Sequence, residues 1–582
     1  MEKLKEWIYS YKEIYISLIK KLKKNRGNNL LIILFSIVLM FPIYRTGINV
    51  NDELQLRFYR FLGLKSFFKY HYEAVLKQQG RMPFPLVLND YLNFFSTEQR
   101  IYKLVEIFII ISNVVLFGYF LYKVTKNRKL SLLTMIIFIT FLPMGWESVP
   151  PDAYTGMYGI SISVFFISLI YYENYLETKN KNFLIISGIT YLYCLLTYEL
   201  FLFYFIIYLV IVLFKKDNSL KIIYNNLKYI ILITLCYIIL YFILRLCYPS
   251  IYDGNKLALI SLKRTLEQIF FMFKSSFPGY YLFNVKYQFL FRVYNEFSGI
   301  SDFFLNIRII FYIILGIYFI NKILELNAPK MEIKKNIFLI LIIIFLMILT
   351  LSVRVLSKSN QENPIVGPDL FIGFTNTYFV YFLSVFIISS IISVFNNKIF
   401  KILIAAIFII FSTSVQIMNE VISLRQEKEY KKLMDTEKIF ETGELSKWNG
   451  KKIFSEDLYK MGLSIGIHRD YWTEFSKIKN LDIKVSNNLN NQNGIIMTKN
   501  NGKRDIFILG MINSVIQEKQ ILTKSIFVFS IDNLELKKIY FKDENNKYNY
   551  IELKNGIKDK NFYRYGVNFD KKVFINSIDI TN

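Results

Sequence analysis

Long apolar runs recur along the first 420 residues of the chain. "NLLIILFSIVLMFPIY" follows Asn28 and "NIFLILIIIFLMILTLSV" follows Lys335. A helix needs about 20 mostly apolar residues to cross a bilayer, because its backbone polar groups must all be bonded within it. The pattern predicts an all-α polytopic membrane protein.

Eleven spanning helices are expected, because eleven runs have suitable length and composition. The run 183–214 is too long for one span and is divided at Thr197–Glu199, where "TYE" places a charge mid-run. The expected spans are 29–47, 101–123, 130–145, 154–172, 183–197, 199–214, 228–247, 304–323, 336–353, 370–394 and 399–418.

Lysines at the ends of these runs indicate the orientation. Placing the basic N-terminus in the cytoplasm makes every even-numbered gap lysine-bearing and cytoplasmic, as the positive-inside rule requires. Those gaps contain "KVTKNRK", "ENYLETKNKN", "KKDNSLK", "NKILELNAPKMEIKK" and "NNKIFK". We therefore expect a multi-pass cell-membrane protein whose C-terminus lies outside the cytoplasm.

Three regions follow from this pattern. Residues 1–28 form a basic, partly amphipathic cytoplasmic segment, and 29–418 form the transmembrane domain with long outer loops at 48–100 and 248–303. The second loop contains "FFMFKSSFPGYYLF", an aromatic stretch that suits a re-entrant or interfacial position. Residues 419–582 contain short alternating segments such as "KSIFVFSIDNLELKKIYF", which predict a small external domain rich in β-strand.

Charge and metal-ligand residues narrow the possible functions. The net charge is +26, from 71 Lys and Arg against 45 Asp and Glu, but the lysines cluster at span ends as topology signals, so no nucleic-acid partner is expected. The three cysteines lack metal-ligand spacing, and His71 and His468 are isolated. Phosphate loops, nucleophile elbows and intramembrane HExxH motifs do not occur in the sequence.

The first outer loop carries two candidate features. Asp52 and Glu53 follow the first span at the membrane boundary, where paired carboxylates can act as a general base or hold a divalent cation. Arg81 follows Gly80 in a turn and could grip a phosphate with two hydrogen bonds. The alternatives are two solvated charges ending a helix and an arginine that meets lipid headgroups.

Three further acids are candidates for orienting a substrate. Glu147 and Asp152 lie beside Trp146 in the short loop before the fourth span, where they suit sugar hydroxyls or a metal. Glu199 falls inside an apolar run, and such an acid normally faces the bundle interior or a water-filled cavity. The alternative for Glu147 and Asp152 is that they are ordinary turn acids. The alternative for Glu199 is that it lies at a hairpin tip near the outer surface.

Basic residues gather at the outer ends of other spans. Arg245 ends the seventh span, Arg354 and Lys358 follow the ninth, and Arg45 ends the first. Together they could form a pocket for a lipid phosphate. The alternative is that they snorkel to the interface.

The order of these motifs resembles the GT-C superfamily of membrane glycosyltransferases, and within it the bacterial O-antigen glucosyltransferase type. The matching positions are the acidic pair Asp52 and Glu53, the Gly80–Arg81 pair, Asp152 before the fourth span, and Thr197–Glu199 as the motif of a later span. The resemblance covers about the first 200 residues. The family often has Asp-Asp at the acidic pair and a glutamine where Glu199 stands.

The resemblance implies inverting transfer of a sugar from a polyprenyl-phosphate donor to a cell-surface glycan or a lipid-linked acceptor. Asp52 would be the catalytic base. Glu53 would assist it or bind a divalent cation, which would be the cofactor. Other roles that we assign are phosphate binding by Arg81, Arg354, Arg245 and Lys358, and substrate orientation by Glu147, Asp152, Tyr198 and Glu199. A transporter or flippase of lipid-linked saccharides and a polysaccharide polymerase or ligase remain alternatives.

Overall fold

The computed structural model consists of two compact units, each described by itself. The first is helical and comprises 1–46, 70–92 and 96–424; the second comprises 47–69, 93–95 and 425–582. The structure describes residues 26–47, 62–95, 99–144, 149–151, 153–215, 220–280, 307–327, 333–362, 376–395, 397–459, 471–486, 488, 492–500, 505–512, 514–517, 520–531, 533–534, 538–553, 556–575 and 578–581.

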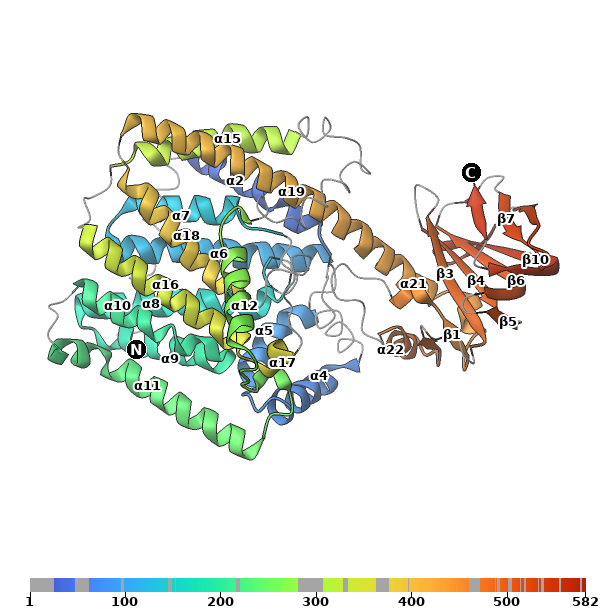
Figure 1. Ribbon diagram of the computed structural model, residues 1–582, viewed down its shortest axis with the longest axis horizontal. Helices are drawn as coiled ribbons and strands as arrows, with labels where there is room; N and C mark the ends of the chain where they lie inside the picture. Colours follow the sequence, from blue (N-terminus) through green and yellow to red (C-terminus); the bar gives the residue numbers. More distant parts are fainter. Residues whose placement is uncertain are drawn as a thin grey trace, which may run out of the picture. The chain divides into compact units, whose positions relative to one another are not determined.

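Each of the eleven apolar runs contains a helix (Figure 1). These helices are α2 (Arg26–Arg45), α6 (Gln99–Thr125), α7 (Arg128–Thr140), α8 (Ile160–Thr178), α9 (Lys181–Thr197), α10 (Phe205–Lys215), α11 (Leu220–Cys247), α15 (Ile307–Glu325), α16 (Ile333–Val355), α18 (Thr377–Val394) and α19 (Lys398–Ile439).

Seven helices in the described part of the chain are long and apolar enough to cross a membrane. The remaining apolar segments are shorter: α7 has 13 residues, and Leu30–Arg45 within α2, Lys181–Thr197 and Glu199–Phe214 have 17 or fewer. The protein therefore has a polytopic helical character, while the count of eleven spans stays a prediction. The long segments are Arg100–Thr125, Thr155–Thr178, Lys221–Cys247, Ile307–Glu325, Ile337–Val355, Thr377–Val394 and Lys398–Ile439.

The division of the long run at "TYE" is confirmed. Helix α9 ends at Thr197, Tyr198 adopts an extended conformation (φ −153°, ψ 125°), and a short 3₁₀ turn, η3 (Glu199–Leu202), precedes α10. Glu199 therefore lies at a break between two helices and not within one.

Helices α6, α7, α8, α16 and α18 pack around one continuous core, and α9, α10 and α11 extend it from the side of α8. Helix α2 packs on α15 and α6. Helix α18 is buried along most of its length, whereas α11 is mostly exposed. The exposed apolar faces suit contact with lipid.

The chain also contains shorter elements in or beside the expected outer loops. They are α4 (Leu64–His71), a π-helical turn η1 (Tyr72–Lys77), α5 (Phe84–Phe95), the π-helical turn η2 (Thr155–Gly159) that begins the α8 span, η4 (Asp253–Asn255), α12 (Leu262–Ser275) and α17 (Lys358–Glu362).

Helix α12 has an unusual distribution of side chains. Thr265 and Gln268 are buried against the bundle, while Leu266 and Phe270 are exposed. The Gln268 amide donates to the Asn360 carbonyl oxygen at 3.1 Å, and α12 runs across α16 in Figure 1. The exposed surface of α12 thus combines apolar residues with the charged Lys263 and Glu267, which suits an interfacial position in a bilayer.

The C-terminal β-sheet domain expected from the alternating segments is present. Its larger sheet has the order β2-β1-β3-β4-β6-β10-β9, with β5 paired to β6. Strand β1 is parallel to β2 and β3, and the other pairs are antiparallel. A second, antiparallel sheet has the order β11-β7-β8.

Ile508, Ile526 and Val528 lie in the core of the domain. Most of the domain's strands are short, as their spacing predicts, but β6 has 11 residues and β10 has 13. Their bounds are β1 (Lys452–Phe454), β2 (Lys484–Ser486), β3 (Gly494–Asn500), β4 (Asp505–Met511), β5 (Ser514–Gln517), β6 (Gln520–Ser530), β7 (Lys538–Lys542), β8 (Tyr548–Glu552), β9 (Ile557–Asp559), β10 (Phe562–Phe574) and β11 (Asp579–Thr581). Three short helices accompany them: α20 (Gly443–Ser446), α21 (Glu456–Tyr459) and α22 (Tyr471–Ile478).

Candidate functional site

Arg81 lies in the turn between η1 and α5, directly after a glycine that the turn requires. Gly80 has φ +62°, and a Cβ there would come within 2.5 Å of the Tyr248 carbonyl oxygen. The same turn is held to the segment after α11, because the Ile251 N–H donates to the Gln78 carbonyl oxygen at 2.9 Å. A residue with a side chain at position 80 would push these two segments apart.

Arg81 and Glu199 form a two-point ion pair. Arg81 Nε lies 2.7 Å from Glu199 Oε1, and Arg81 Nη2 lies 2.8 Å from Glu199 Oε2. Arg245 Nη2 approaches Oε1 of the same carboxylate at 3.9 Å. Two guanidinium groups thus share one carboxylate, so this cluster, which we call the Glu199 triad, carries one net positive charge.

The guanidinium of Arg81 stays protonated and positively charged. Burial alone would lower the pKa of its guanidinium, but the adjacent Glu199 carboxylate raises that pKa above its ordinary value. The side chains of Arg81, Glu199 and Arg245 are mostly buried but each retains some exposure.

Tyr198 forms an aromatic wall next to this triad. The Arg81 guanidinium lies 5.9 Å from the centre of the Tyr198 ring, and the Tyr198 hydroxyl donates to Asn376 Oδ1 at 2.7 Å. The Tyr158 ring is 5.7 Å from that of Tyr198. The break between α9 and α10 is therefore tied to the start of α18 and to η2.

The basic residues after α16 divide into two groups. Arg354 and Arg81 both lie within electrostatic reach of the Tyr158 hydroxyl. Lys358 instead forms ion pairs with Asp253 and Glu362, each at 3.5 Å. Arg354 thus interacts electrostatically with the same tyrosine as Arg81, while Lys358 already has two acidic partners.

The partners of Lys358 form a small ionic cluster on the surface. A hydrogen bond from Lys256, together with the charge of Lys358, lowers the pKa of Asp253. Asp253 and Glu362 in turn raise the pKa of Lys358. These mutual effects favour the charged forms of Asp253 and Lys358.

The predicted acidic half of the site lies outside the described residues. Asp52, Glu53, Glu147 and Asp152 belong to segments whose positions the structure does not describe, so their roles stay predictions. Within the described part of the chain, no group of three or more His, Cys, Asp or Glu side chains is arranged to hold a metal ion. The binding of a divalent cation by Asp52 and Glu53 stays a prediction.

Sequence reasoning missed a second triad of the same composition. Glu420 accepts from Arg45 Nη1 at 2.5 Å and lies 2.7 Å from Arg308 Nε. From the sequence, we grouped Arg45 with Arg245, Arg354 and Lys358 in a basic pocket and did not predict that Arg45 pairs with Glu420. The available signal was that Glu420 comes just after the apolar run 399–418. Its two arginine partners could not be predicted, because Arg45 lies on α2 and Arg308 on α15.

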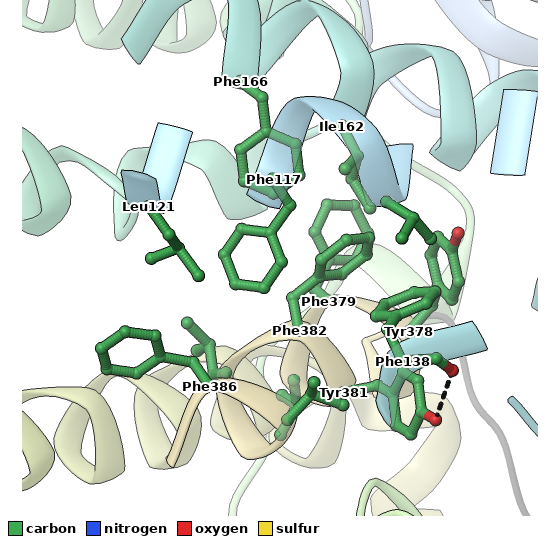
Figure 2. Close-up of a cluster of buried hydrophobic side chains, with 14 of the residues drawn as sticks. Phe117, Leu121, Phe138, Ile162, Phe166, Tyr378, Phe379, Tyr381, Phe382 and Phe386 are labelled. Carbon is green, nitrogen blue, oxygen red and sulfur yellow. Dashed lines mark hydrogen bonds between the residues drawn. The ribbon is translucent and has the colours of Figure 1, made fainter. Parts of the chain in front are cut away.

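An apolar cavity of about 90 Å³ adjoins the Tyr198 wall inside the bundle. Its lining is aromatic and aliphatic and comes from α6, α8, α10, α16 and α18, with contributions from η3. Figure 2 shows part of this lining, in which Phe117, Phe166 and Phe382 lie together. Phe379 belongs to the lining and also lies 5.9 Å, ring to ring, from both Tyr158 and Tyr198.

Phe379 therefore connects two different environments. On one side are the Glu199 triad and two tyrosine rings, and on the other is a space lined by hydrocarbon. A charged cluster and a space lined by hydrocarbon thus lie on opposite sides of one side chain, which is the order of the head and tail of an amphiphile.

Comparison with known proteins adds no relative to this picture: no protein-family model, curated protein or solved structure matches the chain.

Proposed function

We propose that this protein transfers a sugar from a polyprenyl-phosphate carrier to a cell-surface glycan or lipid-linked acceptor on the outer side of the membrane. The observation that carries the proposal is the junction at Phe379 between a cationic, tyrosine-walled cluster and an apolar cavity. A lipid-linked sugar phosphate has the corresponding parts: an anionic head, a sugar and a hydrocarbon chain.

The basic residues have a defined task in this reaction. As the bond between the anomeric carbon and the phosphate oxygen breaks, negative charge grows on the leaving phosphate. Arg81 and Arg245 from the Glu199 triad, with Arg354 beside Tyr158, supply fixed positive charge for it. The rings of Tyr158 and Tyr198, which are buried beside this charge, would contact the sugar once the ligand has opened the site.

The acidic residues complete the proposed step. The acceptor hydroxyl oxygen attacks the anomeric carbon, its proton passes to Asp52, and polyprenyl phosphate departs with the bonding electrons. Attack from the face opposite the leaving group inverts the anomeric centre. Glu53 assists Asp52 or holds a cation, and Glu147 and Asp152 orient the sugar or the acceptor.

The test is a transfer assay on proteoliposomes that contain the purified full chain. They receive a panel of radiolabelled polyprenyl-phosphate hexoses and, as acceptor, an envelope glycan fraction from the source cells. We expect Asp52→Asn to lose about 10²–10⁴-fold of the transfer rate, the usual contribution of a general base. Donor binding should survive, because the base acts on the acceptor.

Asp543→Asn is the matched control, since Asp543 lies in a turn of the β domain and accepts backbone hydrogen bonds there. It should transfer at the wild-type rate. An unchanged rate in Asp52→Asn would remove that residue as base. Movement of the labelled lipid across the bilayer without any transfer would instead identify a flippase.

A further inference from the structure

We infer that Glu199 is an internal counter-ion that occupies the anion site of Arg81 and Arg245, and that a phosphate-bearing ligand displaces it. The inference rests on the proposed function for the ligand's chemical class, a phosphate monoester or diester. It assigns Glu199 a gating role in place of the sugar-orienting role expected from the sequence.

The positions of the Glu199 oxygens support this role. Both face the Nε–Nη2 edge of Arg81, at 2.7 and 2.8 Å. That edge is the planar fork with which an arginine binds two oxygens of a phosphate. Arg81 therefore cannot bind a phosphate through this edge while Glu199 remains in place.

The charge of the triad also favours an additional anion. Two guanidinium groups face one carboxylate, and Arg245 Nε is buried without a hydrogen-bond partner among the described residues. A buried donor left unbonded is costly. A phosphate, with more oxygens and up to two charges, can satisfy donors that a single carboxylate leaves unbonded.

The Glu420 triad provides an internal comparison. There, Arg308 Nη1 donates to the Val38 carbonyl oxygen at 3.0 Å, and Nη2 donates to that of Gln416 at 2.9 Å. Glu420 is only 2% exposed, against 19% for the Glu199 side chain. Two arginines and one glutamate thus form a closed structural cluster in one place and a partly open one at the candidate site.

Space at the Glu199 triad requires a displacement. The cavity that Gly80, Arg81, Glu199, Tyr237 and Leu244 help to line has a volume of about 10 Å³. That volume is about one water molecule, well below a phosphate group. A ligand can enter only if the carboxylate leaves.

The backbone at Glu199 permits such a movement. Glu199 opens a 3₁₀ turn directly after the extended residue Tyr198, so no long helix must bend when its side chain changes rotamer. The displacement that we infer is a rotation of this side chain, which is 19% exposed.

Direct binding measurements on the purified full chain test this inference. The probes are decyl phosphate, inorganic phosphate and uncharged decanol, titrated calorimetrically into wild type and Glu199→Gln. Removing the competing charge should tighten decyl phosphate binding about five- to tenfold, a typical coupling between two ligands of one site. A gain confined to decyl phosphate identifies a lipid headgroup as the ligand, and an equal gain with inorganic phosphate identifies free phosphate.

Three further variants separate the possible failures. Glu420→Gln makes the same chemical change in the closed triad and should leave phosphate affinity unchanged. Arg81→Gln should weaken phosphate binding. Glu199→Ala must show the same gain as Glu199→Gln, which keeps the test decisive if the glutamine variant does not remain monodisperse.

Equal or weaker binding by both Glu199 variants would overturn the inference, because Glu199 would then hold Arg81 in position for the ligand. The phosphate site of the proposed function would survive that result if Arg81→Gln still lost affinity. If Arg81→Gln bound phosphate as well as wild type does, the phosphate site itself would be wrong.

Discussion

Arg81 and Glu199 lie 118 residues apart in the chain and form a two-point ion pair, with nitrogen–oxygen distances of 2.7 and 2.8 Å. The pair connects the turn after η1 to the break between α9 and α10. It therefore links the first outer loop to the aromatic wall of Tyr198 and, through Phe379, to the apolar cavity.

The first prediction concerns the planar fork of Arg81. Arg81→Lys keeps the positive charge but cannot present two parallel donors. We expect decyl phosphate affinity and sugar-transfer rate each to fall about tenfold or more, on the scale of a lost charge-assisted hydrogen bond. Lys256→Arg, a change on the exposed loop, is the control and should alter neither. Normal binding and turnover in Arg81→Lys would show that this residue meets only lipid headgroups.

The second prediction concerns stability and uses the Glu420 triad. Glu420→Gln leaves Arg45 and Arg308 facing each other without the carboxylate between them. Removing one partner of a buried charge cluster should lower the free energy of unfolding by about 3–5 kcal/mol. Glu177→Gln breaks an exposed pair with Lys126 and should cost less than about 1 kcal/mol. Denaturant unfolding of the two purified variants measures the difference, and equal losses would contradict the buried role of Glu420.

The sequence predicted much of this fold because the membrane imposes strong local rules. Each apolar run contains a helix, and the charge at Glu199 marked the break between α9 and α10. Alternating residues after 419 predicted strands, and β6 and β7 form there. The short length of α7 was missed, because an apolar run does not show where its helix ends.

The arrangement of the site depends on contacts that local patterns do not contain. Arg81 and Glu199 were both recognised as candidates, but as separate ligands for phosphate and sugar and not as partners. Their pairing depends on how the turn at Gly80 packs against the segment after α11. The apolar cavity was missed because phenylalanines that line a cavity and those that face lipid look alike in a sequence.

The third prediction concerns pH and the contact between residues 256–258 and 356–358. Lys358 N–H donates to the Lys256 carbonyl oxygen at 2.7 Å, next to the ionic cluster of Asp253. The pKa of Asp253 is lowered from its ordinary 3.8, first by the hydrogen bond from Lys256 and then by nearby charge. Because the folded-state pKa is the lower one, the stabilisation is complete above pH 3.8 and is lost as the pH falls through the lowered value.

Hydrogen exchange of the Lys358 amide, corrected for its intrinsic rate, measures this effect. Asp253→Asn should speed the exchange about two- to fourfold at pH 7, the scale of an exposed pair. Wild type and variant should converge once the pH has fallen through the lowered pKa of Asp253. A difference that persists undiminished at pH 2.5 would mean that the Asp253 charge does not hold this contact.

The fourth prediction concerns orientation. In a background carrying Cys236→Ser and Cys247→Ser, single cysteines replace Asn545 and Lys263 on the predicted outer side and Lys126 on the predicted inner side. An impermeant thiol reagent applied to intact cells should label the first two sites, and Lys126→Cys only after the membrane is opened. The reverse pattern would place the N-terminus outside, and labelling of Lys263→Cys without Asn545→Cys would reject the external β domain.

The fifth prediction concerns the apolar cavity as the site of the lipid tail. Ile343 lies on α16 in the cavity lining, so Ile343→Trp should fill part of that space. Overfilling a packed interior costs about 1–3 kcal/mol, and we expect photolabelling by a prenyl phosphate with a diazirine on its chain to fall about fivefold or more. Ile239→Trp adds the same bulk to an exposed face of α11 and should label as wild type does. Inorganic phosphate affinity should be unchanged in both variants, because the Glu199 triad is left intact. Equal labelling of the two tryptophan variants would place the lipid tail outside the cavity, against the surface of the bundle.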